Sequence, residues 1–102
     1  MPKLLTELEI KSRLVGLRGW KREGDFITRT FEFGNFMQGI RFINRIAKIA
    51  EQKQHHPDIL VRYTTINLSI QTHDAGGLTK KDFDLASAIE RLLPRRKKKI
   101  GA

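Results

Sequence analysis

The segment Asn35–Thr72, NFMQGIRFINRIAKIAEQKQHHPDILVRYTTINLSIQT, contains the change of pattern that decides the fold. Its first half predicts a long helix from an Asn35 N-cap to about Lys53, because apolar residues recur there every three or four positions. Pro57 cannot continue the helical hydrogen-bond ladder and restricts the residue before it, so this helix must end by His56.

The predicted helix carries more apolar surface than one face of a small core requires. Burial deep in the core and contact with another subunit both explain this width. The apolar residues form two adjacent stripes, Phe36, Ile40, Ile43, Ala47 and Ala50, and Phe42, Ile46 and Ile49.

After Pro57 the apolar period changes from that of a helix to that of a strand. Two strands are predicted, Ile59–Tyr63 and Thr65–Thr72. In the second of them, alternation places Ile66, Leu68 and Ile70 on one face and polar residues on the other. Continued alternation would place His73 on the polar side.

The N-terminal third predicts a helix followed by a hairpin. Thr6 and Glu9 have the spacing of a capping box, and the helix they open would end near Gly16 or Gly19. The turn Glu23-Gly24-Asp25 would join two strands, residues 20–22 and 26–33.

A last helix is predicted from a Thr79 cap to Pro94. The order helix, strand, strand, helix, strand, strand, helix predicts an α+β fold: a single domain with a four-stranded, antiparallel-rich sheet and three helices packed on one face. We expect this domain to cover residues 1–93 and residues 94–102 to form a basic, disordered tail.

Composition limits the function classes. The 102-residue chain has no cysteine, which excludes disulfides and thiolate metal sites and fits a reducing cytoplasm. No apolar run is long enough for a signal peptide or a membrane span. The formal charge is +9, and five basic residues are consecutive at Arg95, Arg96, Lys97, Lys98 and Lys99. A solvated tail explains this run, and weak nonspecific contact with nucleic acid is the alternative.

All three histidines lie at the ends of predicted elements: His55 and His56 after the long helix, and His73 after the last strand. Imidazole exchanges protons near neutral pH, so histidines that converge with carboxylates would form a proton-transfer site. Glu51 precedes His55 by four residues, and a continuous helix would place both on one face. Asp82 begins the last helix and is the second candidate carboxylate.

Each of these residues also has a structural explanation. Asp82 stands three after Thr79 and can be the acidic member of a capping box, and Glu51 can be a charge on a solvated helix face. Two histidines at a helix C-terminus are favourable because positive charge is stabilised there. Zinc is disfavoured because adjacent helical histidines point about 100° apart and the histidine-glutamate zinc signature is absent.

Together these residues resemble the pterin-4a-carbinolamine dehydratase family over nearly the whole chain. The resemblance is carried by Glu51-x-x-x-His55-His56-Pro57, by Tyr63 six residues later, and by the segment Thr72–Asp82 with the sequence THDAGGLTKKD. Trp20, Phe31-x-Phe33 and Asp84-Leu85-Ala86 also match.

The resemblance implies a lyase, 4a-hydroxytetrahydrobiopterin dehydratase, with no metal or other cofactor. Such enzymes remove water from the 4a-hydroxytetrahydropterin that aromatic amino acid hydroxylases leave, and the quinonoid dihydropterin product is then recycled. Loss of the hydroxyl needs a general acid, and a base must take a proton from a ring nitrogen.

The resemblance further implies roles for residues. His55 and His73 would be the proton-transfer pair, and His56 would bind the pterin or share in the proton transfer. Glu51 would orient His55, and Asp82 would hold His73 or stabilise its protonated form. Which histidine is acid and which is base stays open. The pterin edge would be lined by Gln54, Gln71, Thr72 and Asp74. Two departures from the family pattern are Gln54 and Asp58-Ile59.

The family also implies a homodimer or homotetramer, with sheets joined at their edges and long helices paired. Animal relatives additionally act as a dimerisation cofactor of a homeodomain transcription factor. A non-catalytic module of the same fold, acting as a protein or nucleic-acid partner, is therefore the alternative function.

Overall fold

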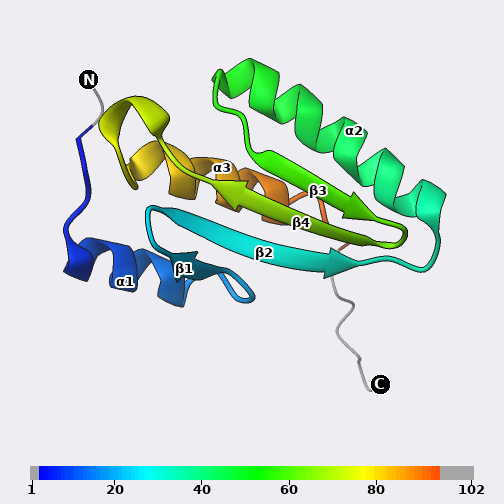
Figure 1. The fold of residues 1–102 in the computed structure, drawn as a ribbon, viewed down its shortest axis with the longest axis horizontal. Coiled ribbons are helices and arrows are strands. Elements are labelled where there is room, and N and C mark those ends of the chain that lie inside the picture. Colours follow the sequence, from blue (N-terminus) through cyan, green and yellow to red (C-terminus); the bar gives the residue numbers. More distant parts are fainter. Residues whose placement is uncertain (1–2, 95–102) are drawn as a thin grey trace.

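Four antiparallel strands form the sheet, and the computed structural model describes residues 3–94 of the chain. The strands β1 (Lys21–Glu23), β2 (Phe26–Glu32), β3 (Asp58–Arg62) and β4 (Thr65–Ile70) are arranged in the order β1-β2-β4-β3 (Figure 1). All three pairings are antiparallel, so the predicted sheet is confirmed.

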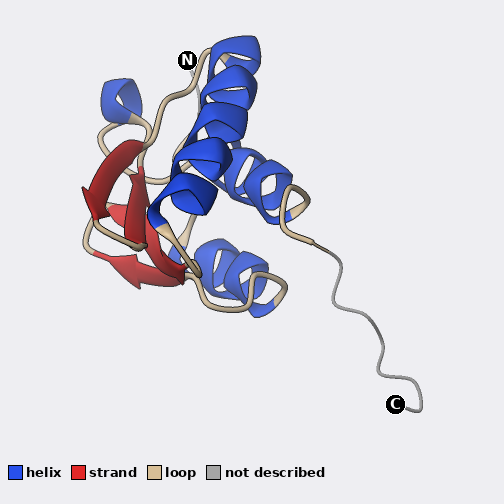
Figure 2. Cartoon of the chain, turned by 90° about the vertical axis from the view of Figure 1, so that its right-hand side faces the viewer, coloured by secondary structure: helices blue, strands red, loops and turns tan. Residues whose placement is uncertain are grey.

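Three helices lie on one face of this sheet, α1 (Glu7–Val15), α2 (Phe36–Lys53) and α3 (Lys80–Glu90). Figure 2 shows the helices on one side of the strands and the opposite side uncovered. A short 3-10 helix, η1 (His73–Ala75), joins β4 to α3. The α+β class and the single domain are therefore as predicted.

Side chains at the predicted caps begin each helix. Thr6 and Glu9 form both hydrogen bonds of a capping box at α1, and the Asn35 side chain accepts from the Gln38 amide at α2. These bonds satisfy amides that have no partner within the helix. Local sequence thus sets where the helices start.

The core lies between the helices and the inner face of the sheet. Ile66, Leu68 and Ile70 of β4 have no exposed surface, as their alternation predicts. Phe31 of β2 packs against Phe42 of α2 with ring centroids 5.0 Å apart. The residues of the two predicted stripes of α2 are buried to different degrees: Phe42, Ile46 and Ala50 are almost fully buried, while Phe36 keeps 45% of its surface exposed.

Several boundaries differ from the predictions. β4 ends at Ile70 and not at Thr72, because the chain turns into η1. α3 ends at Glu90, four residues before Pro94, so the proline does not set its end. β3 spans Asp58–Arg62, one residue earlier than predicted.

No helix within residues 3–94 is both long enough and apolar enough to span a membrane. The predicted disordered tail and its nucleic-acid contact fall on residues outside the described range, among them Arg95, Arg96, Lys97, Lys98 and Lys99.

Candidate active site

The C-terminus of α2 turns His55 toward the interior. Gln54 adopts a left-handed conformation (φ 52°), and its side-chain amide donates to the Glu51 carbonyl at 2.7 Å. Such a cap ends a helix and changes the direction of the chain. The His55 amide then bonds to the Ala50 carbonyl, and His55 retains only 9% of its exposure.

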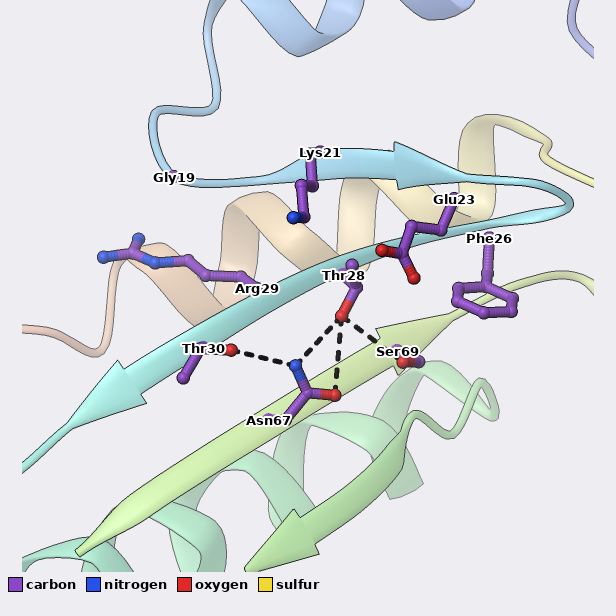
Figure 3. A pocket seen from close by; sticks show the side chains of 9 residues that line it. All are labelled: Gly19, Lys21, Glu23, Phe26, Thr28, Arg29, Thr30, Asn67 and Ser69. Atoms are coloured by element: carbon purple, nitrogen blue, oxygen red, sulfur yellow. Dashed lines mark hydrogen bonds between the residues drawn. The ribbon is translucent and has the colours of Figure 1, made fainter.

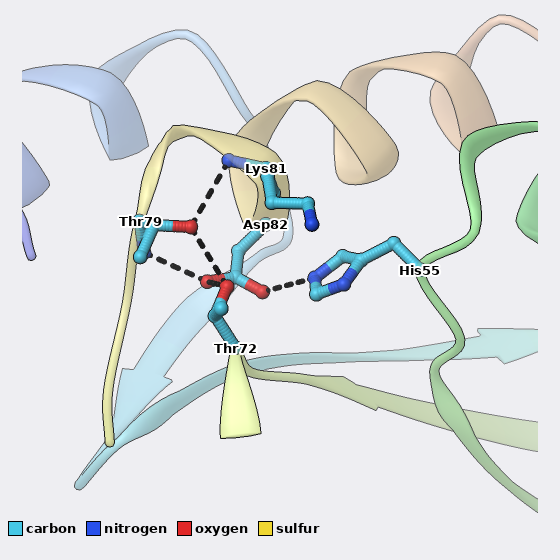
Figure 4. Close-up of polar contacts among 5 residues, drawn as sticks. All are labelled: His55, Thr72, Thr79, Lys81 and Asp82. Carbon is cyan, nitrogen blue, oxygen red and sulfur yellow. Dashed lines mark hydrogen bonds and ion pairs between the residues drawn. The ribbon is translucent and has the colours of Figure 1, made fainter. Parts of the chain in front are cut away.

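Asp82 is the centre of the site and has no exposed surface. It occupies the first turn of α3, where Thr79 is the N-cap and where the helix dipole favours negative charge. Its Oδ2 accepts from the Thr79 amide and from the Thr72 hydroxyl, each at 2.8 Å. Its Oδ1 lies 2.7 Å from Nε2 of His55 (Figure 4).

Both oxygens of the Asp82 carboxylate therefore have partners, and a buried carboxylate requires such compensation. The site joins three separate parts of the chain: the end of α2, the residue before η1, and the first turn of α3. The arrangement can hold one imidazole in a fixed orientation and stabilise the positive charge it gains when it takes a proton.

A second histidine–carboxylate pair lies nearby in sequence but at the surface. His56 Nε2 is 2.6 Å from Glu51 Oε2, and the two side chains are 55% and 72% exposed. Exposed ion pairs contribute little stability, so this pair holds its histidine less firmly than the buried one does.

His73 is exposed and begins η1, directly after the buried Thr72. Within residues 3–94, its side chain makes no hydrogen bond. Gln54 is occupied by its helix cap, Gln71 is half-buried, and Asp74 is exposed in η1.

The pairings differ from those expected. Asp82 holds His55 and not His73, and Glu51 contacts His56 and not His55. The second difference arises because α2 ends at Lys53, so the helical spacing of Glu51 and His55 is broken by the left-handed Gln54.

Thr79 belongs to the buried network, although its sequence position predicts only a cap. Its hydroxyl lies 2.7 Å from the hydroxyl of Thr72, whose side chain is likewise directed toward Asp82. The available sequence signal is its position three residues before Asp82, which also predicts a cap and does not distinguish the two roles.

The uncovered face of the sheet carries a separate polar hollow of about 460 Å³ (Figure 3). Its floor is Thr28, which donates to the Leu68 carbonyl and accepts from Asn67 and Ser69. The hydroxyls of Thr28 and Ser69 and the Asn67 amide are bonded to one another, and Lys21 and Glu23 also line the hollow. It contains no histidine and does not extend the site around Asp82.

Residues 3–94 contain no cluster of three histidine or carboxylate side chains arranged for a metal ion.

A family model for pterin 4 alpha carbinolamine dehydratase matches residues 3–92. The chain belongs to this family. The resemblance carried by Glu51, the histidines and the segment through Asp82 is therefore confirmed.

Bacterial relatives extend over almost the same length. A protein of Roseiflexus castenholzii is 47% identical over 93 residues, which cover 91% of this chain and all of the relative. One of Acidobacterium capsulatum is 48% identical over 89 residues, covering 87% and 97%. Both names give pterin-4-alpha-carbinolamine dehydratase and mark that assignment as provisional.

Solved structures show the same fold. A crystal structure described as a transcriptional coactivator/pterin dehydratase from Brucella melitensis has a TM-score of 0.87 and 30% identity, and the match covers 90% of this chain and all of that one. A pterin dehydratase-like protein described as a RuBisCO assembly factor of the alpha-carboxysome has a TM-score of 0.59 and 20% identity, over 72% and 84%. The second likeness concerns the fold alone.

Proposed function

We propose that this protein is a hydro-lyase that dehydrates 4a-hydroxytetrahydropterin to quinonoid dihydropterin and water. The observation that carries the proposal is the 2.7 Å contact between His55 and the buried Asp82. A positioned histidine–carboxylate pair is what proton transfer in such a reaction requires, and membership of the family supplies the substrate class.

The reaction needs two proton transfers. One group donates a proton to the 4a-hydroxyl, which then leaves as water as the carbon–oxygen bond breaks. Another group accepts a proton from a ring nitrogen, and the electrons of that bond form the new double bond of the product. His55 is one of the two groups, because Asp82 can stabilise it when it is charged.

His56 and His73 are the candidates for the other group. His56 is exposed and paired with Glu51, which would stabilise its protonated form. His73 is exposed next to Thr72, a residue of the buried network. We propose that one of them supplies the second proton transfer and that Gln71 and Asp74 contact the pterin edge.

The test is the rate of carbinolamine dehydration, followed by ultraviolet absorbance. We expect loss of roughly 10²–10⁴-fold in turnover for His55→Ala, as for removal of a general acid or base. His73→Ala and His56→Ala, measured beside it, identify the second group. A chelator is expected to leave the rate unchanged, and full activity of His55→Ala/His73→Ala would contradict the mechanism.

We also propose that the protein assembles through its β3 edge. β3 is an outer strand of the sheet, and Leu60 on it is 52% exposed. An apolar outer strand is normally covered by another chain or by protective charges. A second copy of this chain would extend the sheet and cover that strand.

A partner-binding function without catalysis is the alternative. The Brucella melitensis protein is described as coactivator and dehydratase together, and its fold closely matches this one. Wild-type protein that is folded but does not accelerate dehydration, together with partner binding that His55→Ala leaves unchanged, would favour this alternative.

A further inference from the structure

A directional chain of hydrogen bonds leads from the start of α3 to His55. The Lys81 amide donates to the Thr79 hydroxyl at 3.2 Å, and the two threonine hydroxyls lie 2.7 Å apart. The Thr72 hydroxyl is 2.8 Å from Asp82 Oδ2, and Oδ1 is 2.7 Å from His55 Nε2 (Figure 4).

The position of each proton in this chain follows from the capacity of each group. The carboxylate of Asp82 only accepts, so the Thr72 hydroxyl must donate its single proton to it. The Thr79 hydroxyl must then donate to Thr72, while it accepts from the Lys81 amide. His55 must donate from Nε2, because the carboxylate oxygen that it faces only accepts.

Nδ1, the other ring nitrogen of His55, is consequently the one that does not bond to Asp82. Every fully buried side-chain nitrogen and oxygen in the described residues has a hydrogen-bond partner. Nδ1 of His55 bonds to no described residue, and therefore it reaches the surface of the site. In the neutral ring, the nitrogen opposite the Nε2–H group carries the lone pair that can accept a proton.

We propose that Thr79 is a positioning residue that acts through Thr72 and Asp82 to keep His55 as its Nε2–H tautomer, with Nδ1 as the proton-accepting atom. The catalytic consequence rests on the proposed dehydration. The tautomer is a property of the folded protein and is measured without substrate. Thr79 therefore has two tasks, since its hydroxyl both caps α3 and orients the next hydroxyl of the chain.

The experiment compares Thr79→Val with Thr79→Ser, because valine removes only the hydroxyl and serine retains it. Thr72→Val is the second variant, since the Thr72 side chain caps no helix and its loss leaves the α3 cap intact. Thr28→Val is the matched control: this threonine is also buried and bonded, but it lies in the hollow on the opposite face of the sheet.

The first readout is the pair of imidazole nitrogen resonances of His55 in the nitrogen-15-labelled full chain, assigned with His55→Gln. In the wild type we expect one protonated and one unprotonated nitrogen, widely separated in chemical shift. In Thr79→Val and Thr72→Val we expect the two resonances to approach each other. The first substitution removes the hydroxyl that orients Thr72, and the second removes the Thr72 hydroxyl that donates to Asp82. Thr79→Ser and Thr28→Val should keep the wild-type separation.

The second readout is steady-state dehydration. We expect kcat to fall roughly tenfold in both valine variants with KM unchanged, as for loss of a group that orients a catalytic residue. A raised KM at unchanged kcat would mean that Thr72 contacts substrate and would overturn the proposal, as would wild-type resonances in both variants. If the resonances change as expected but the wild type has no dehydratase activity, the proposed function is refuted and the positioning role of Thr79 stands.

Discussion

Replacing Asp82 with asparagine tests the centre of the site most directly. The carboxylate accepts from the Thr72 hydroxyl and the Thr79 amide through Oδ2 and from His55 through Oδ1. The asparagine amide has the same volume, but it has one accepting oxygen and one donating NH₂ group in place of two accepting oxygens. If its oxygen takes the place of Oδ2, its NH₂ group faces Nε2 of His55, and two donors meet.

The conflict can be relieved only at a cost to the site. His55 can move its proton to Nδ1, which makes Nε2 the acceptor and removes the lone pair from the exposed nitrogen. We therefore expect kcat to fall by about 10²–10⁴-fold, the usual contribution of a general base. Loss of a charge-assisted bond at a residue with no exposed surface should lower the free energy of unfolding by about 1–3 kcal/mol.

The assays are carbinolamine dehydration and thermal unfolding, with Asp84→Asn as the matched control. Asp84 lies on the same helix, but its side chain is 47% exposed and pairs only with Lys80 at i,i+4. Its replacement should change stability by less than about 0.5 kcal/mol and leave the rate unchanged. Equal effects of the two substitutions, or a fully active Asp82→Asn, would refute the role given to the His55–Asp82 contact.

Three further expectations concern regions outside the site. The hydroxyls of Thr65 and Thr64 donate to the Glu32 carboxylate and lower its pKa. The stability that these bonds contribute is therefore fully present above the pKa of glutamate in the unfolded chain, about 4.3. It is lost as pH falls through the lower pKa of Glu32 in the folded protein. Thermal unfolding of wild type and Glu32→Gln should therefore differ at pH 7 and converge in acid; a constant difference would contradict this. A chain ending at Leu93 should keep wild-type turnover, and a folded but inactive truncation would show that the tail takes part. Leu60→Lys on the β3 edge should reduce the mass measured by light scattering, and an unchanged mass would exclude that edge as the contact.

Much of the fold could be predicted because its signals are local. Capping residues at Thr6, Asn35 and Thr79 lie within three positions of the amides or carboxylates that they contact. The alternation in β4 reports the burial of Ile66 and Leu68 within a single strand. Both predictions use residues close together in the sequence, and neither depends on which elements contact each other in the fold.

The contacts of the site could not be predicted in the same way. The spacing of Glu51 and His55 implies a shared face only while the helix continues, and Gln54 interrupts it with a left-handed residue that sequence alone rarely reveals. Alternation in β4 places Thr72 on the core face and His73 on the polar face, and the structure has them buried and exposed in that way. The alternation does not reveal that Asp82 is the residue that the Thr72 hydroxyl contacts.

Asp82 shows why two explanations of one residue need not exclude each other. As the third residue of α3 it completes a capping box, and that function uses Oδ2 with the Thr79 amide. The other oxygen, Oδ1, contacts His55, and the helix cap does not need this contact. Because a planar carboxylate fixes both oxygens together, holding Oδ2 at the helix also fixes Oδ1 at the imidazole. The start of α3 thus gives the site its rigidity, and the stability of the helix and the orientation of the histidine depend on the same group.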